Sequence, residues 1–322
     1  EHVGSCDYLY MVIFVKLSDV IIRLVFPREI QINPEFSEFC PAAADKPDLT
    51  VRFSWDWANA LRPQGEMSGQ DRIQNYWIGH DMNFCETRGG WKGPVGSVVF
   101  DNNFKEMVCT VNAEPFIYEI TELSGFFRML PIRRILSHYG TLFFHASQIA
   151  VGENGILFTG VSGSGKSTQA KLWEKHRGAE IICNDRALVR ERGGCWRTYG
   201  FPIDGSEPVV SGKVKHLAAV ILLRKSDHTT IRKLPLIEAL GKLMPQMVMD
   251  GWDRNERNKI LLLLGNMVKN TPVYELCCTP TEEAVDILEN ELRNGGIILG
   301  RKNQRQIVEK CSRYANSVDC SD

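Results

Sequence analysis

The sequence predicts an α/β protein with a β-rich N-terminal region, and three observations support this fold class. Apolar residues make up 43% of the 322 positions and charged residues 24%, as in ordinary globular domains. The first third is rich in short runs of β-branched and aromatic residues. From residue 142 onward, strand-like and helix-like segments alternate, which is typical of α/β domains. We therefore expect a β-rich region over 7–122, an α/β domain over 123–296 and a polar tail over 297–322.

The N-terminal region is expected to consist of strands. Runs of β-branched and aromatic residues predict strands over 9–15, 20–26, 49–53, 96–100 and 106–111. Between residues 59 and 96, Gly, Pro, Asn and Trp are frequent, which indicates loops. The sequence of this region contains no phosphate loop, metal-ligand pattern or nucleophile motif, so the chemistry is expected elsewhere.

A helix predicted over 123–138 opens the second domain, because apolar residues recur at helical spacing and Gly140 follows as a stop signal. His138 falls at the C-terminal end of this helix, where an imidazolium meets the negative dipole end, so we expect a structural role for it. A turn at 192–194 predicts a hairpin. The later pattern predicts strands at 142–150, 155–159, 180–183, 218–223, 229–234 and 273–277, and helices at 166–176, 236–248, 254–268 and 281–293.

Residues 160–167 match the phosphate-loop pattern G-x-x-x-x-G-K-[ST] in full, directly after an apolar strand and directly before a helix. Glycines let backbone N–H groups turn toward phosphate oxygens, and the helix N-terminus adds a positive dipole end. Lys166 is expected to contact the β- and γ-phosphates and Ser167 to bind Mg²⁺. The expected cofactors are therefore ATP, or another nucleoside triphosphate, and Mg²⁺. The residues expected to bind the nucleotide are Gly160, Ser162, Gly163, Ser164, Gly165, Lys166 and Ser167.

Two features flank this loop. The segment 151–154 joins the strand 142–150 to the strand that leads into the loop. A connection this short makes an antiparallel hairpin, so the phosphate strand is expected in a mixed sheet. Downstream, Asp185 follows the strand 180–183, and strand ends beside a phosphate loop are where α/β sheets gather ligand-binding groups.

Asp185 is a candidate for orienting a metal ion or accepting the proton of an incoming hydroxyl, and the alternative is a surface aspartate that begins a turn. His145 lies on the strand that pairs with the phosphate strand, where it can hydrogen-bond Asp185, and the alternative is a packing histidine. The Gly- and Pro-rich segment 199–208 either lines the acceptor side or is an ordinary surface loop. Four arginines are candidates for relieving transition-state charge, with none favoured: Arg186, Arg190, Arg192 and Arg197.

The order of these parts resembles the kinase domain of HPr kinase/phosphorylase, which phosphorylates a serine of a phosphocarrier protein and shares a core with phosphoenolpyruvate carboxykinases. The resemblance covers about residues 123–289. It rests on Phe144-His145-Ala146-Ser147, the hairpin, residues 160–168, Ile182-Cys183-Asn184-Asp185 and residues 196–207. The chain departs from the family at Asn184, which stands where HPr kinase has the first of two consecutive aspartates.

The resemblance implies a mixed-sheet P-loop kinase core of the HPr kinase/phosphoenolpyruvate carboxykinase type, preceded by a β-rich domain that recognises the acceptor. It implies that Lys166 and Ser167 serve phosphate and Mg²⁺, that Asp185 is the catalytic base and a second Mg²⁺ ligand, and that His145 assists it. Thr168 falls within the nucleotide-binding segment that the resemblance covers. Relatives of this kind also form homo-oligomers.

The leading functional hypothesis is an ATP- and Mg²⁺-dependent kinase that transfers the γ-phosphoryl to a hydroxyl, preferentially a serine of a peptide or protein. The β-rich region favours a peptide or protein over a small acceptor. One alternative is a kinase of a small metabolite, which would share the whole nucleotide-binding half. Another is a nucleotide-binding regulatory module in which phosphate orders a loop and no phosphoryl group is transferred.

Charge and hydropathy limit the expected partners. The formal net charge is −1, with Lys+Arg 38 against Asp+Glu 39, which lacks the basic excess of dedicated nucleic-acid binders. The longest apolar runs, such as 260–264, are too short to cross a bilayer, so no membrane partner is expected. The 10 cysteines include no C-x-x-C pair and are too few for a disulfide scaffold, which favours reduced thiols and a cytoplasmic location.

Overall fold

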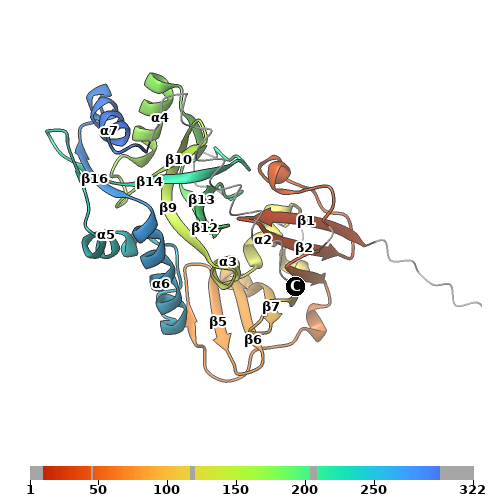
Figure 1. Cartoon of the computed structure of the whole chain (residues 1–322). Helices are drawn as coiled ribbons and strands as arrows, with labels where there is room; N and C mark the ends of the chain where they lie inside the picture. The colour runs from red at the N-terminus through yellow and green to blue at the C-terminus, as the bar shows by residue number, and fades with distance from the viewer. Residues whose placement is uncertain (1–9, 45, 117–119, 204–208, 298–322) are drawn as a thin grey trace, which may run out of the picture. The chain divides into compact units, whose positions relative to one another are not determined.

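The computed structural model describes residues 10–44, 46–116, 120–203 and 209–297, and within them the chain forms two compact units. The first unit contains the described residues up to Tyr139 together with Asp250–Arg254. The second contains Gly140–Met249 and the described residues from Asn255 onward. Each unit is a mixed sheet with helices, which confirms an α/β protein with a β-rich N-terminal part (Figure 1).

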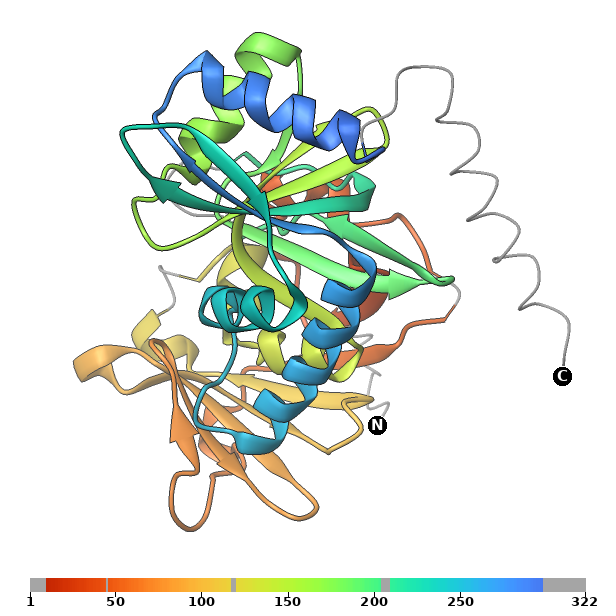
Figure 2. The ribbon, with the colours of Figure 1, turned by 60° about the vertical axis from the view of Figure 1, so that its left-hand side comes forward.

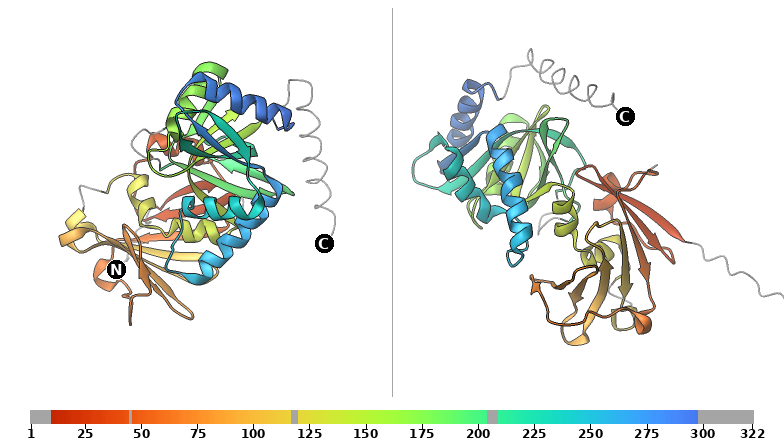
Figure 3. Two further views of the ribbon diagram at one scale, coloured as in Figure 1. Left: turned by 90° about the vertical axis from the view of Figure 1, so that its left-hand side faces the viewer. Right: turned by 60° about the horizontal axis from the view of Figure 1, so that its bottom comes forward.

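The first unit is built on an eight-stranded sheet with the order β1-β2-β3-β8-β7-β6-β5-β4. Figure 3 shows the ribbon of this N-terminal part from two further sides. Strand β2 pairs in parallel with β3, and β3 with β8, whereas the other neighbours are antiparallel. Ser18 and Asp19 take positive φ angles of 46° and 62°, which make the two-residue turn between β1 and β2. The strands are β1 Met11–Leu17, β2 Val20–Phe26, β3 Leu49–Ser54, β4 Gly69–Gln70, β5 Gln74–Ile78, β6 Asn83–Arg88, β7 Pro94–Phe100 and β8 Glu106–Val111.

Strands β4, β5 and β6 correct the expectation of loops between residues 59 and 96. Two polar residues, Gln74 and Tyr76, occupy inward positions of β5 and are buried. The Tyr76 hydroxyl donates to Gln74 Oε1 at 2.7 Å, and Gln74 Nε2 donates to the carbonyl of Met129 at 2.8 Å. Because hydrogen-bonded polar side chains fill the inner face here, the apolar alternation that signals a strand is absent from the sequence.

The single helix expected over 123–138 is two helices, α2 Leu123–Met129 and α3 Ile132–His138. They are separated at Pro131, because proline disfavours a helical conformation of the preceding residue. Both helices belong to the first unit, so the boundary lies after residue 139 and not after 122. Aromatic packing explains this, since the ring of Phe126 lies 5.4 Å from that of Phe26, between centroids. The first unit also has the short helix α1 Ala113–Phe116 and the 3-10 helices Pro34–Phe39, Trp57–Asn59 and Gly90–Lys92.

The second unit has a mixed sheet centred on the strand that leads into the phosphate-loop motif. This strand, β10, pairs antiparallel with β9 and parallel with β14, and β14 pairs parallel with β16, which confirms the predicted hairpin and mixed sheet. The hairpin expected around 192–194 is also present, between β12 and β13. The strands are β9 Thr141–Val151, β10 Asn154–Thr159, β11 Glu180–Cys183, β12 Arg186–Arg192, β13 Cys195–Tyr199, β14 Val214–Lys225, β15 Thr230–Lys233 and β16 Val273–Cys278.

Helices cover both faces of this second sheet. On one face, α4 Lys166–Arg177 and α7 Glu282–Asn294 lie side by side (Figure 2) and share ion pairs from Arg177 to Asp286 and Glu289. On the other face, α5 Leu236–Leu243 and α6 Arg254–Asn270 bury residues such as Leu243 and Leu264. The helix expected over 236–248 ends early, and the 3-10 turn Met244–Gln246, which contains Pro245, follows it.

The carboxyl ends of three parallel strands meet at one edge of this sheet. Strands β10, β14 and β16 run in the same direction and end at Thr159, Lys225 and Cys278. The phosphate-loop motif begins directly after β10, so it lies at this edge. Among the described residues, no helix is both long and apolar enough to span a membrane.

Candidate functional site

The phosphate-loop motif forms a turn whose backbone requires glycine. It runs from the end of β10 at Thr159 to the start of α4 at Lys166. Three of its glycines have positive φ angles, +148° at Gly160, +75° at Gly163 and +98° at Gly165. A Cβ atom on Gly160 would lie 2.8 Å from the carbonyl oxygen of Leu223 on β14. The glycines therefore set the path of the loop and its close approach to the neighbouring strand.

The side chain of Lys166 contacts backbone carbonyls of the phosphate loop. Its side-chain Nζ donates to the carbonyl of Gly160 at 3.1 Å and lies 3.4 Å from that of Val161, and the residue is 8% exposed. Burial lowers the pKa of Lys166, while the negative charge of Asp185 acts in the opposite direction. The ammonium group is thus held at the loop by two neutral carbonyls that a phosphate oxygen can replace.

Asp185 and His145 meet beside the loop, which is the contact that the sequence suggested. Their backbones are brought together because His145 on β9 pairs with Arg186 at the start of β12. His145 Nε2 lies 3.1 Å from Asp185 Oδ1, and Arg186 Nε lies 3.4 Å from Oδ2. The hydrogen bond from His145 lowers the pKa of Asp185 against the effect of burial, and the charges of His145, Arg186 and Lys166 lower it further.

Two buried hydroxyls, which sequence reasoning missed, fix the strands around this pair. Ser147 Oγ donates to the carbonyl of Asn184 at 2.7 Å, and Thr159 Oγ1 donates to the carbonyl of His145 at 2.9 Å. Both hydroxyl-bearing residues are fully buried. They therefore tie β9 to the turn that carries Asp185 and to the strand that carries the loop. Their only sequence signal is a polar residue within an apolar strand.

The other residues at the loop differ in their exposure to solvent. Ser162, Gly163 and Thr168 are exposed, and Ser167 is half-buried. Ser164 is buried, and its Oγ has no hydrogen-bond partner within the described structure. A buried hydroxyl without a partner at the loop is consistent with a ligand that supplies the missing hydrogen bond.

Ser167 and Asp185 fit the chemistry of a magnesium site. Mg²⁺ in nucleotide sites is held by one or two side-chain oxygens together with substrate phosphates, and a serine hydroxyl and a carboxylate are ligands of this type. Within the described ranges, no group of three or more His, Cys, Asp and Glu side chains is arranged to hold a metal ion alone.

Among the four arginines considered from sequence, Arg186 lies beside Asp185. Arg190 pairs in register with Thr141 at the opposite end of this stretch of β9, and Arg192 with Cys195 at the far hairpin. In the segment 199–208, Phe201 and Ile203 are buried, which excludes an ordinary surface loop for these positions. Residues 204–208 lie outside the described ranges.

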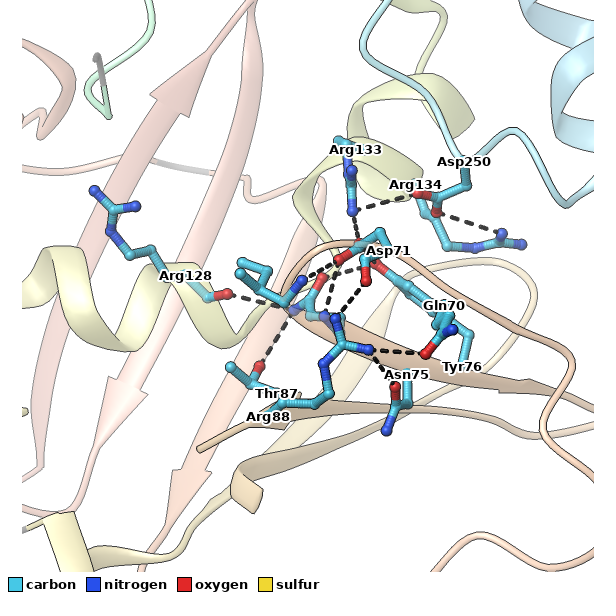
Figure 4. A network of polar contacts seen from close by, with 12 residues as sticks. Gln70, Asp71, Asn75, Tyr76, Thr87, Arg88, Arg128, Arg133, Arg134 and Asp250 are labelled. Atoms are coloured by element: carbon cyan, nitrogen blue, oxygen red, sulfur yellow. Dashed lines mark hydrogen bonds and ion pairs between the residues drawn. The ribbon is translucent and has the colours of Figure 1, made fainter. Parts of the chain in front are cut away.

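The first unit carries a separate polar network around a buried carboxylate, Asp250 (Figure 4). Arg133 Nη2 lies 3.3 Å from Asp250 Oδ1 and also contacts Asp71. Arg134 donates to Asp253 at 2.9 Å, and burial raises the pKa of Asp250. The network attaches the segment Asp250–Arg254 to helix α3, so its role in this unit is structural.

Comparisons with known proteins give little independent information about this chain. No family model matches the sequence, and no curated protein matches it. A solved structure of the HPr(Ser) kinase/phosphatase from Coxiella burnetii is similar with a TM-score of 0.29 and 12% sequence identity, over 56% of this chain and 99% of that chain. At this TM-score the likeness carries no argument about function, which has to be inferred from the site itself.

Proposed function

We propose that this chain is a P-loop kinase of the HPr kinase type, which uses ATP and Mg²⁺ to phosphorylate a hydroxyl group, preferentially a serine of a peptide or protein. The observation that carries the proposal is the pairing of Asp185 with His145 beside a complete phosphate loop. A phosphoryl-transfer site needs groups that bind the phosphates and a group that orients or deprotonates the nucleophile, and the loop and Asp185 can supply these two parts. We also propose that the protein forms a homo-oligomer and is located in the cytoplasm.

In the proposed reaction, the backbone N–H groups of residues 160–167 and the ammonium of Lys166 bind the phosphates of the nucleotide. The acceptor hydroxyl oxygen forms a bond to the γ-phosphorus, while the bond between that phosphorus and the β,γ-bridging oxygen breaks. The electron pair of the broken bond leaves with ADP, and the hydroxyl proton passes to the carboxylate of Asp185. Mg²⁺, held by Ser167 and Asp185, would neutralise negative charge on the β- and γ-phosphates.

The electrostatics of Asp185 suit the task of orienting a hydroxyl. Because its pKa is below the usual range, the carboxylate is ionised at neutral pH and accepts a hydrogen bond from the acceptor. His145 and Arg186 hold the two carboxylate oxygens, so the group keeps a fixed direction. A weak base of this kind takes the proton late, as the phosphorus–oxygen bond to ADP breaks and the acceptor oxygen becomes acidic.

The test is transfer of labelled γ-phosphate from ATP with Mg²⁺ into cell-lysate fractions separated by size. We expect label in a peptide or protein fraction with the wild type and a loss of about 10²–10⁴-fold in Asp185→Asn. Asp286→Asn on α7 is the matched control, since this exposed carboxylate contacts Arg177 on α4. Label confined to small molecules would replace the proposal with a metabolite kinase. Nucleotide binding without any transfer would replace it with a regulatory module.

A further inference from the structure

A pocket opens in the first unit, between the segment that follows β2 and the segment that precedes α2. Its volume is about 430 Å³, which lies within the range of ordinary small-molecule sites. Two backbone hydrogen bonds join its walls, from Gln31 N to the carbonyl of Thr121 at 3.3 Å and from Leu123 N to the carbonyl of Gln31 at 2.8 Å. The walls are therefore fixed relative to each other without a ligand.

Part of the pocket lining is apolar. Ile30 and Ile120 line it and are half-buried, and Phe126 of α2, which also lines it, is fully buried. Phe126 packs against Phe26 at the end of β2, so this part of the lining belongs to the core of the unit (Figure 1). The pocket thus offers a hydrocarbon surface to the apolar part of a ligand.

Two opposite charges line the same pocket. Arg28 and Glu29 are exposed, and neither forms an ion pair within the described part of the chain. No internal ion pair has to be broken when either group binds a ligand. The pocket therefore has one positive and one negative group available, beside an apolar wall.

The guanidinium of Arg28 is held in place by an aromatic ring. Its Cζ lies 4.4 Å from the centroid of the Trp55 ring, and the Trp55 ring lies 5.7 Å from that of Phe126, between centroids. Because Phe126 lines the pocket, this row of contacts keeps the guanidinium beside it. A guanidinium that lies over an aromatic face still presents paired N–H donors at its edge, which suits a carboxylate.

We infer that this pocket binds an apolar α-amino acid, with its carboxylate at Arg28, its ammonium group at Glu29 and its side chain against Ile30 and Ile120. Trp55 is the positioning residue of Arg28. A phosphate ester fits less well, because its two negative charges would lie in a pocket that Glu29 also lines. The inference concerns the first unit alone and does not depend on the proposed kinase reaction.

The experiment measures, by isothermal titration at neutral pH, the affinity of the full chain for L-phenylalanine, 3-phenylpropionate, 2-phenylethylamine and glycine. The last three probes lack the ammonium group, the carboxylate and the apolar side chain, respectively. We expect L-phenylalanine to bind most tightly and each other probe to bind about tenfold more weakly or worse. A lost charged hydrogen bond, or an apolar side chain left out of the pocket, has an effect of this size.

Substitutions assign the two charges separately. Arg28→Ala should weaken L-phenylalanine by about tenfold or more and leave 2-phenylethylamine unchanged, because that probe has no carboxylate. Glu29→Gln should weaken L-phenylalanine and leave 3-phenylpropionate unchanged, because that probe has no ammonium group. Arg62→Ala is the matched control and should bind as the wild type does. Arg62 also lies on a tryptophan ring of the first unit, 3.9 Å from the centroid of Trp57, and is not among the residues that line the pocket.

Several results would overturn the inference. A wild type that binds L-phenylalanine no more tightly than the other three probes, or not at all at millimolar concentration, would refute the ligand class. Equal affinity of Arg28→Ala and Arg62→Ala for L-phenylalanine would refute the assignment to this pocket. Thermal unfolding of each variant checks that these exposed positions leave the fold intact. Arg28→Lys, which keeps the charge without the paired donors, should lose less affinity than Arg28→Ala.

Discussion

Replacing Gly160 by alanine tests whether the backbone of the phosphate loop is as constrained as its geometry indicates. The φ angle of +148° lies in a region that L-residues rarely adopt, and holding a side chain there costs about 1–3 kcal/mol. A new Cβ would also come within 2.8 Å of the carbonyl oxygen of Leu223 and of Ser164 Oγ. The carbonyl belongs to β14 and cannot rotate away, so the loop itself has to move.

We expect Gly160→Ala to lower both stability and nucleotide affinity. For a domain of this size, each kcal/mol lowers the Tm by about 2–4 °C. Movement of the loop displaces backbone donors from the phosphates, and each charged hydrogen bond lost is worth about 1.5–3 kcal/mol, or roughly 10–100-fold in Kd. Differential scanning calorimetry and isothermal titration with a non-hydrolysable ATP analogue measure the two effects.

Gly178→Ala provides the matched control. Gly178 follows α4 with a φ angle of +62° and has open space around its missing Cβ, so alanine costs about 1–2 kcal/mol of backbone strain without a clash. Its stability should fall while its nucleotide affinity stays at the wild-type value. The reasoning is refuted if Gly160→Ala binds nucleotide as tightly as the wild type, or if both variants lose affinity to the same extent.

Variants at three further positions test packing and electrostatics in the second unit. Trp173→Ala should cost about 3–5 kcal/mol in urea unfolding because the side chain is fully buried. Trp173→Phe should cost clearly less, because it keeps an aromatic ring in the site and removes an indole N–H that has no hydrogen-bond partner among the described residues. Equal losses in the two variants would contradict this. Burial and the charge of Arg197 lower the pKa of His216, so the unfolded state binds more protons, and stability should fall as pH drops below about 6.5. His216→Gln should flatten that slope below about pH 6.5, and an unchanged slope would contradict the assignment. His145→Ala should raise the pKa of Asp185 toward its usual value and slow phosphoryl transfer. The loss of stability should be under about 1 kcal/mol, because the side chains of His145 and Asp185 are 42% and 33% exposed. An Asp185 pKa that carboxyl NMR finds unchanged would refute this contact.

The features of the fold that depend on short-range interactions could be predicted from the sequence. The loop of residues 160–167 follows from its motif and context, and the antiparallel pairing of β9 with β10 follows from the short connection between them. The contact between His145 and Asp185 follows from the same hairpin, because it fixes which strand lies beside the loop. The roles of these residues and of Ser167 stay predictions.

Long-range packing determined the parts that the sequence did not reveal. The buried side chains of Gln74 and Tyr76 hydrogen-bond to each other, so their strand lacks the apolar alternation by which a strand is recognised in a sequence. Pro131 interrupts a helical pattern whose apolar spacing continues across the break. The segment Asp250–Arg254 belongs to the first unit through ion pairs with arginines more than a hundred positions away, such as Arg134 with Asp253. No local pattern encodes such a partner.

The central claim is that residues 160–167 bind the phosphates of a nucleotide. The most direct measurement is the Kd of a non-hydrolysable ATP analogue with Mg²⁺ for the wild type, Lys166→Ala and Asp185→Asn. The account predicts binding by the wild type, a loss of at least about tenfold in Lys166→Ala, and a smaller loss in Asp185→Asn, because Lys166 would contact phosphate directly whereas Asp185 would reach the nucleotide only through Mg²⁺. Equal affinity of the wild type and Lys166→Ala would contradict the account.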